Sequence, residues 1–218
     1  MTMRIAVAIS GRGSNLEALL QALGPGAPAE IVLVISDRAD AAGLRHARGR
    51  NIPVLVLPHP GDADAWLQAL RAHRVDLLVL AGYLKLVPSA VVGSFRGRII
   101  NTHPSLLPAF GGKGMYGHRV HEAVLASGVA ETGVTIHLVD EAYDRGAVLA
   151  QSRVSVLKDD TPERLAARVL EAEHRLLPAA VLAAAAAGKP VEFEESPVAS
   201  RQAPARTPTP NSKAAGQS

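Results

Sequence analysis

The chain of 218 residues contains no cysteine, few aromatic residues and no long hydrophobic run. Without cysteine it has no disulfide framework, no thiolate metal site and no cysteine nucleophile. Aromatic residues make up 3% of the sequence, too few to stack single-stranded nucleic acid. No apolar stretch reaches the roughly 20 residues that span a bilayer, and the first residues lack the pattern of a signal peptide. With 48% hydrophobic residues to form a core, the composition predicts a soluble cytoplasmic protein.

A large excess of charge is also missing. The 23 basic residues exceed the 20 acidic residues by three, and the segment Pro197–Ser218 contains three basic residues and no acidic one. The rest of the chain therefore balances at 20 against 20. The alkaline isoelectric point reflects the C-terminal segment, and the body gives no reason to expect a nucleic-acid partner.

Seven short runs rich in β-branched residues alternate with longer amphipathic stretches. The predicted strands are Arg4–Ile9, Glu30–Ile35, Pro53–Leu57, Asp76–Ala81, Arg98–Asn101, Gly133–Val139 and Val148–Val156. The predicted helices between them are Ser14–Leu23, Ala39–Arg50, Ala63–Arg74 and Arg119–Ser127. Several strands are continuously apolar, which is typical of buried parallel strands, but the last two follow one another without a helix. We predict an α/β fold: an open, mostly parallel twisted sheet with helices on both faces and an antiparallel C-terminal strand.

The C-terminal third predicts one long helix and then a tail. Thr161 is a suitable N-cap, Pro162 suits the first turn, and Gly188 suits a stop after Ala187. After Pro190 the composition changes to Pro, Ser, Thr, Ala and Gln, and Pro197–Ser218 has too little apolar surface to offset the entropy of ordering. We expect one domain over residues 1–190 and a disordered tail over residues 191–218.

The first strand runs into a glycine-rich loop, Ser10-Gly11-Arg12-Gly13-Ser14-Asn15, and then into a helix. Glycines allow a tight turn, and the free N–H groups at a helix N-terminus favour an anion. Leu16 occupies the place where a dinucleotide fingerprint needs a small residue. The loop therefore predicts a single phosphate site, with an ordinary strand–helix turn as the alternative.

A second loop carries residues suited to catalysis. Asn101 ends a predicted parallel strand and His103 follows two residues later, at the position where reactive groups collect in open α/β sheets. Being two apart, they point the same way, and an amide beside an imidazole suits a reaction that develops an oxyanion and moves a proton. Asp144 follows a later strand, and a carboxylate near His103 would raise the pKa of that ring and keep it protonated. Loop aspartates are usually turn formers, so the position of Asp144 alone favours a turn residue.

Three segments together resemble the phosphoribosylglycinamide formyltransferase family of folate-dependent enzymes. They are Gly11–Asn15, the run Asn101-Thr102-His103-Pro104-Ser105-Leu106-Leu107-Pro108, and the loop Asp140–Gly146. The run ending in Ser-Leu-Leu-Pro is specific for formyl-folate transferases in general. The Gly13-Ser14-Asn15 loop narrows the resemblance to the enzymes that act on glycinamide ribonucleotide. The resemblance covers residues 4 to 190.

The resemblance implies the reaction and the roles of the residues. The family transfers a formyl group from 10-formyltetrahydrofolate to the amine of glycinamide ribonucleotide in purine synthesis, without a metal, and we expect a monomer or a homodimer. Asn101, His103 and Asp144 would be the catalytic residues, and His137 matches a histidine beside them. The residues implied in ribonucleotide binding are Gly13, Ser14, Asn15 and Glu173. The residues implied in folate binding are Leu84, Lys85, Leu86, Val87, Asn101, Asp140, Glu141, Ala142, Tyr143 and Asp144.

For two of these groups the sequence pattern alone gives a different interpretation. Glu173 would be a solvated helix residue, and Leu84, Leu86 and Val87 would belong to the core. The chain also shows three departures. Ala63 stands where some members have a folate-side arginine, Gly112 stands where many members have proline, and Arg145 replaces a glycine next to Asp144. Without that arginine, Ala63 leaves no predicted partner for the glutamate tail of the folate.

Three other functions compete with this interpretation. A methionyl-tRNA formyltransferase shares the Ser-Leu-Leu-Pro run but needs a further RNA-binding domain. A formyltetrahydrofolate hydrolase carries an additional N-terminal domain, whereas the first strand here begins at Arg4. A catalytically silent nucleotide-binding module would have the same fold, because fold does not imply function.

Overall fold

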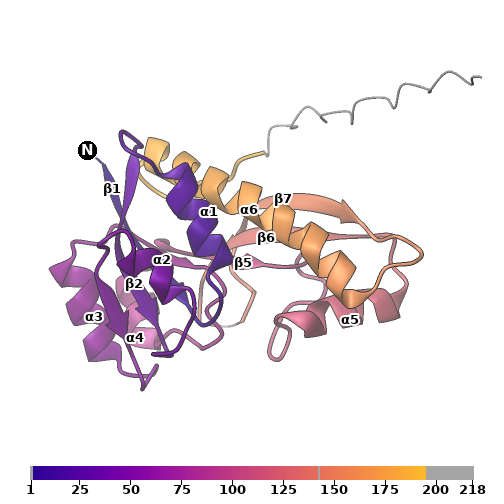
Figure 1. Cartoon of the computed structure of the whole chain (residues 1–218), viewed down its shortest axis with the longest axis horizontal. Helices are drawn as coiled ribbons and strands as arrows, with labels where there is room; N and C mark the ends of the chain where they lie inside the picture. Colours follow the sequence, from indigo (N-terminus) through magenta and orange to yellow (C-terminus); the bar gives the residue numbers. More distant parts are fainter. Residues whose placement is uncertain (1, 142, 195–218) are drawn as a thin grey trace, which may run out of the picture.

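The computed structural model describes residues 2–141 and 143–194, which form seven strands and six helices arranged around one sheet (Figure 1). The strands are β1 (Met3–Ile9), β2 (Ala29–Ser36), β3 (Val54–Val56), β4 (Leu77–Leu80), β5 (Ile99–His103), β6 (Glu131–Leu138) and β7 (Val148–Ser155). The helices are α1 (Ser14–Ala22), α2 (Leu44–Arg48), α3 (Ala63–Ala72), α4 (Ser89–Ser94), α5 (His118–Ser127) and α6 (Pro162–Ala187). The predicted tail Pro197–Ser218 lies outside the described residues.

The sheet has the strand order β3-β2-β1-β4-β5-β6-β7. Strands β1 to β5 pair in parallel, β6 pairs antiparallel with β5, and β7 pairs antiparallel with β6. The predicted fold class is therefore confirmed, including the antiparallel end of the sheet. The chain changes direction along the sheet between β1 and β4, and this is the position where open α/β sheets place their ligands.

Alternate residues of the central strands supply two separate cores. In β1, Ile5, Val7 and Ile9 face a core built with α1, α2, α5 and α6, while Ala6 and Ala8 face a core built with α3 and α4. This alternation follows from the two-residue period of a strand. Because both faces are covered by helices, the strands are apolar throughout (Figure 1).

The long helix α6 has the ends that its sequence predicts. The side chain of Thr161 accepts a hydrogen bond from the Arg164 N–H, and Gly188 ends the helix with φ 72°. Two other helices differ from the prediction. Helix α2 is shorter than the predicted Ala39–Arg50, and α4, which begins after Pro88, was not predicted.

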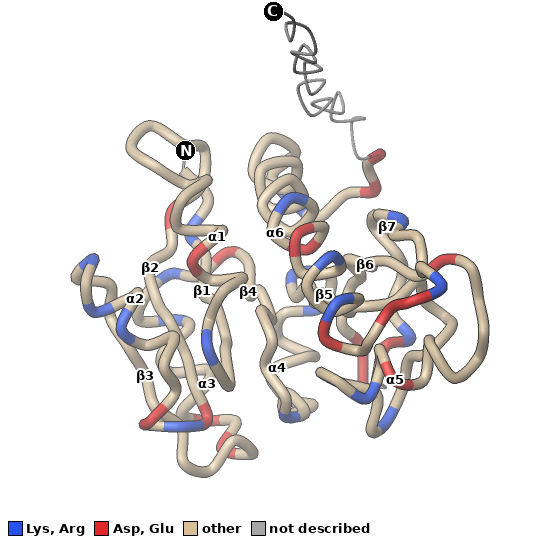
Figure 2. Tube along the Cα trace, turned by 45° about the vertical axis from the view of Figure 1, so that its right-hand side comes forward, with Lys and Arg blue, Asp and Glu red and all other residues tan. Residues whose placement is uncertain are grey.

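Acidic and basic residues are interspersed along the described chain, as Figure 2 shows, rather than gathered on one face. This distribution agrees with the balanced charge of the body. Among the helices of the described residues, none is long and apolar enough to cross a membrane.

Candidate active site

The glycine-rich loop lies between β1 and α1, where it forms the turn into the helix. Gly13 is the N-cap of α1 and has φ 76°, a conformation that favours glycine. A Cβ on Gly13 would lie 2.6 Å from the Cα of Gly43, so the two backbones are in close contact. The Gly43 N–H also donates to the Gly11 carbonyl over 3.0 Å. The segment before α2 therefore packs against the glycine-rich loop and holds its backbone in this conformation.

Strand β5 presents neighbouring side chains to opposite faces of the sheet. Asn101 and His103 lie on one face, as predicted, and Thr102 lies on the other. Asn101 pairs across the strands with His137 of β6, and its Nδ2 lies 3.1 Å from the Nε2 of that ring. The Nε2 of His103, which is 4% exposed, lies 2.9 Å from the Phe110 carbonyl. Because a carbonyl only accepts, this nitrogen carries the hydrogen, and Nδ1 is the nitrogen of His103 that can take up a proton.

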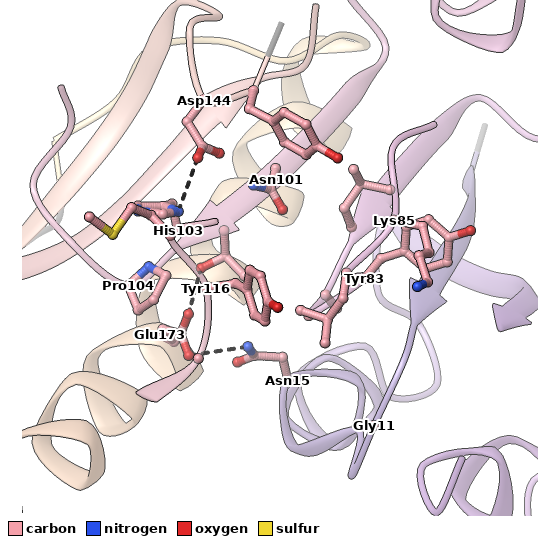
Figure 3. Close-up of a pocket in the computed structure, with 18 of the residues that line it drawn as sticks. Gly11, Asn15, Tyr83, Lys85, Asn101, His103, Pro104, Tyr116, Asp144 and Glu173 are labelled. Carbon is pink, nitrogen blue, oxygen red and sulfur yellow. Dashed lines mark hydrogen bonds and ion pairs between the residues drawn. The ribbon is translucent and has the colours of Figure 1, made fainter. Parts of the chain in front are cut away.

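Asp144 follows β6 and reaches back to the end of β5. Its Oδ2 lies 3.6 Å from the Nδ1 of His103 and accepts from the Gly112 N–H over 2.9 Å. Its Oδ1 lies 3.5 Å from the Nε2 of His137. Asp144 adopts φ 54°, which aspartate tolerates better than most residues. Figure 3 shows its carboxylate directed at His103, so the structure brings together the three predicted catalytic side chains.

The net pKa shift of His103 is opposite to the predicted one. Burial lowers its pKa below the ordinary value of 6.5, and the nearby ring of His137 lowers it further. Asp144 and the Phe110 carbonyl raise the pKa, as expected for Asp144, but burial outweighs them. His103 is therefore mainly neutral at pH 7 rather than held in its protonated form. The depth at which this ring is buried depends on how the elements pack and could not be predicted from the sequence.

Asp144 is ionised at neutral pH despite its burial. Burial raises the pKa of this carboxyl, but contacts with His137, the Gly112 N–H and His103 together lower it below its ordinary value. A carboxylate held in this way can stabilise a proton that arrives on Nδ1 of His103.

Glu173 of α6 is buried, so the interpretation as a solvated helix residue is wrong. Its two carboxyl oxygens accept from the Nδ2 of Asn15 over 3.3 Å and from the hydroxyl of Thr102 over 3.1 Å. Burial raises the pKa of Glu173, and these two hydrogen bonds oppose the rise. The carboxyl thereby joins the glycine-rich loop to the strand that carries Asn101 and His103, as Figure 3 shows.

The loop after β4 forms another wall. The Leu84 N–H donates to the hydroxyl of Ser10 over 2.9 Å, and Tyr83 packs edge-on against Trp66 with the ring centroids 5.6 Å apart. Leu84 and Leu86 are each 50% exposed, so they are not core residues, whereas Val87 is buried as the core interpretation requires. These exposed apolar side chains provide a surface for a flat ring system.

These walls enclose a cavity of about 360 Å³. Of the predicted site residues, those that line it are Gly13, Ser14, Asn15, Leu84, Lys85, Leu86, Val87, Asn101, His103, Asp140, Tyr143, Asp144 and Glu173. Glu141 is exposed and is not among the lining residues, and Ala142 lies outside the described residues.

Sequence reasoning missed Thr102, Tyr116 and His121 as lining residues. Thr102 lies inside the recognised motif, but its contact with Glu173 depends on where α6 packs. His118 and His121 are three apart, which places them on one face of a helix. That spacing was the available signal for His121. Among residues 2–141 and 143–194, no group of three or more His, Asp or Glu side chains is placed to hold a metal ion.

Comparison with known proteins identifies the family. Residues 3–181 match the family model described as formyl transferase. Over 181 residues, or 79% of the chain, the sequence is 48% identical to a chloroplastic phosphoribosylglycinamide formyltransferase of Arabidopsis thaliana, of which it covers 62%. It is 38% identical to the enzyme of that name from Haemophilus influenzae, covering 80% of this chain and 84% of that one.

A solved structure gives the same result. The phosphoribosylglycinamide formyltransferase of Brucella melitensis superimposes with a TM-score of 0.78 at 45% identity, over 85% of this chain and 97% of that one. The chain covers less than two thirds of the length of the plant relatives. The matched region nevertheless includes every strand of the described residues and most of α6. The chain belongs to the formyl transferase family.

Proposed function

We propose that the protein transfers the formyl group of 10-formyltetrahydrofolate to the amine of glycinamide ribonucleotide, a step of purine (IMP) biosynthesis. The observation that carries the proposal is the meeting of Asn101, His103 and Asp144 in a cavity that also contains a glycine-rich loop at a helix N-terminus. The names of the relatives support this acceptor.

In this proposal the ribonucleotide lies between the glycine-rich loop and α6. Gly13, Ser14 and Asn15 offer backbone and side-chain donors to the phosphate, and the start of α1 contributes its partial positive charge. Glu173 is held by Asn15 and Thr102, so its remaining lone pairs can accept from ribose hydroxyls. This arrangement directs the amine toward the end of β5.

The folate then occupies the other half of the cavity. Leu84, Lys85, Leu86 and Val87 form one side, and the segment Asp140–Asp144 forms the other. Backbone donors and acceptors of these two segments suit the polar edge of a pterin, and the half-exposed Leu84 and Leu86 suit its faces.

The reaction joins the amine nitrogen to the formyl carbon and later breaks the bond from that carbon to the folate nitrogen. An N–H of Asn101 stabilises the oxyanion of the tetrahedral intermediate. In other enzymes, removal of one such donor lowers kcat by roughly 10²–10³-fold. Nδ1 of His103 takes the proton that the amine loses, and Asp144 stabilises the resulting imidazolium. The same proton then goes to the departing folate nitrogen, so that no proton is gained or lost overall.

The test measures tetrahydrofolate release spectroscopically with three acceptors in parallel: glycinamide ribonucleotide, methionyl-tRNA and water. We expect release only with the ribonucleotide, and loss of release in His103→Ala. His59→Ala is a matched control, because His59 is exposed and lies outside the cavity lining.

Each other outcome identifies a competing function. Release without an acceptor indicates a hydrolase, and release only with tRNA indicates a methionyl-tRNA formyltransferase. Binding of the ribonucleotide with no release from any acceptor indicates a silent module. We also propose that residues 1–190 suffice as the catalytic domain and that the protein acts in the cytoplasm as a monomer or homodimer. Light scattering of the purified chain tests the oligomeric state.

A further inference from the structure

His137 is a buried histidine that the proposed chemistry does not use. It lies on β6 directly across from Asn101, and its side chain is 2% exposed. Its Nδ1 lies 2.8 Å from the Leu138 carbonyl, and its Nε2 lies 3.1 Å from the Nδ2 of Asn101. Both nitrogens of the ring are therefore engaged, one by the backbone and one by a proposed catalytic side chain.

The backbone contact decides which nitrogen of His137 carries a hydrogen. The Leu138 carbonyl can only accept, so Nδ1 is the donor. A neutral ring with its hydrogen on Nδ1 has a lone pair on Nε2. That lone pair accepts one N–H of Asn101, which matches the 3.1 Å contact.

This contact removes the ambiguity of the Asn101 amide. An amide can turn over and exchange its oxygen for its nitrogen with little change in shape. Turned over, the oxygen of Asn101 would face the lone pair of His137, which is repulsive. With Nδ2 held, the second N–H of Asn101 stays available to a reacting oxygen. We propose that His137 is a positioning residue that fixes the amide of Asn101 as a hydrogen-bond donor, an inference that rests on the proposed formyl transfer.

One neighbour offers His137 a different role. The Oδ1 of Asp144 lies 3.5 Å from the same Nε2. A ring protonated on Nε2 would pair with this carboxylate, and Asn101 would then present its oxygen to that hydrogen. The two roles predict different energetic couplings in double-mutant cycles. If His137 positions the amide, its substitution is coupled to that of Asn101, whereas an ion pair would couple it to Asp144.

Two substitutions at position 137 separate the functions of the two ring nitrogens. Asparagine reaches about as far as Nδ1, so H137N keeps a polar group near Leu138 but removes the acceptor for Asn101. Glutamine reaches about as far as Nε2, so H137Q can offer its oxygen to Asn101. We expect kcat to fall by about tenfold or more in H137N, but by no more than the roughly 10²–10³-fold that follows loss of an oxyanion donor. Both KM values should stay unchanged. H137Q should recover most of this loss.

Double-mutant cycles test the coupling directly. H137N should cause no further loss of kcat in an N101A background and its full loss in a D144N background. Equal loss in H137N and H137Q, or coupling to Asp144 instead of Asn101, would overturn the inference.

A measurement without turnover keeps the inference testable if the proposed function fails. The ¹⁵N shifts of the His137 ring should show the hydrogen on Nδ1 in the wild-type chain at neutral pH. N101A should move the Nε2 resonance and leave the Nδ1 resonance in place. A hydrogen on Nε2 would contradict the inference, whatever reaction the protein catalyses.

Discussion

Adding one methyl group at Gly43 should weaken ribonucleotide binding selectively. A Cβ there would lie 2.8 Å from the Cα of Gly13, 3.0 Å from its nitrogen and 2.7 Å from the Cδ1 of Ile9. Carbon atoms at optimal separation are about 3.5–4.0 Å apart, so the Gly13 backbone must move by at least ~0.7 Å. Because the Gly43 N–H also holds the Gly11 carbonyl, the whole turn should shift in Gly43→Ala.

The expected size follows from the donors that the turn offers. Overpacking of this kind costs about 1–3 kcal/mol of stability. A hydrogen bond to a charged group contributes about 1.5–3 kcal/mol, so misplacing one phosphate donor should raise the KM for the ribonucleotide about 10- to 100-fold. The folate walls lie beyond β4 and β6, so the KM for the formyl donor should stay within about twofold of the wild-type value, as expected for separate sites.

Steady-state kinetics with each substrate varied in turn measure both constants. Gly93→Ala is the matched control, since a Cβ at Gly93 meets no atom within 4 Å. Urea unfolding of both variants separates a loss of stability from a loss of binding. A folded Gly43→Ala variant with an unchanged ribonucleotide KM would refute the argument, as would an equal rise in both KM values.

Further predictions concern three variants, two of them in the proposed site and one in the C-terminal segment that lies outside the described residues. Asp144→Asn should lower kcat by roughly 10²–10⁴ with ribonucleotide affinity by calorimetry nearly intact; normal turnover would contradict the role of Asp144. Because Asp144 raises the pKa of His103, this variant should also shift the acid limb of kcat/KM to lower pH; an upward shift would contradict that sign. His121, with a pKa lowered to about 4 by burial and by its neighbours His118 and His103, should destabilise the protein as pH falls below the unfolded value of 6.5. Wild-type protein should lose stability between pH 7.5 and pH 5, and His121→Gln should lose about 2 kcal/mol less, as measured by urea unfolding. An equal loss in both proteins would show that the folded protein accepts a proton on His121 as easily as the unfolded chain does. Deleting Pro197–Ser218 should leave kcat/KM unchanged, and a large loss would show that this segment takes part in folding or catalysis.

The sheet could be predicted because each strand carries its own signal. Runs such as Leu77–Leu80 are buried on both faces, and only a strand between two layers of helices tolerates that. Helix α6 was equally predictable, since Thr161 and Gly188 mark its ends, and it continues through Pro178 because tertiary packing buries that face.

The two differences in the helices have local causes. The segment before α2 contains Gly43, whose N–H donates to the Gly11 carbonyl instead of to a carbonyl one turn earlier, so the regular helix begins only after it. Helix α4 has six residues, of which three are Ser or Gly, so its sequence gives a weak helical signal. It forms because Val91 and Val92 are buried against the sheet.

The site was only partly predictable. Asn101 and His103 share a face because of the strand period, which the sequence contains. Their meeting with Asp144 depends on β6 lying beside β5, and the burial of Glu173 depends on where α6 crosses the sheet. These are consequences of topology, and without the resemblance to a family no local pattern would have joined residues separated by this much of the chain.

The neutral state of His103 changes the order of events in the proposed reaction. The amine must be uncharged to attack, and it becomes strongly acidic once its bond to the formyl carbon forms. A neutral Nδ1 can take that proton, whereas a ring already protonated could not. Asp144, whose carboxylate accepts from the Gly112 N–H, then stabilises the imidazolium where it forms. Burial and the carboxylate therefore act in sequence: burial keeps His103 ready to accept a proton, and Asp144 makes the protonated state accessible during the reaction.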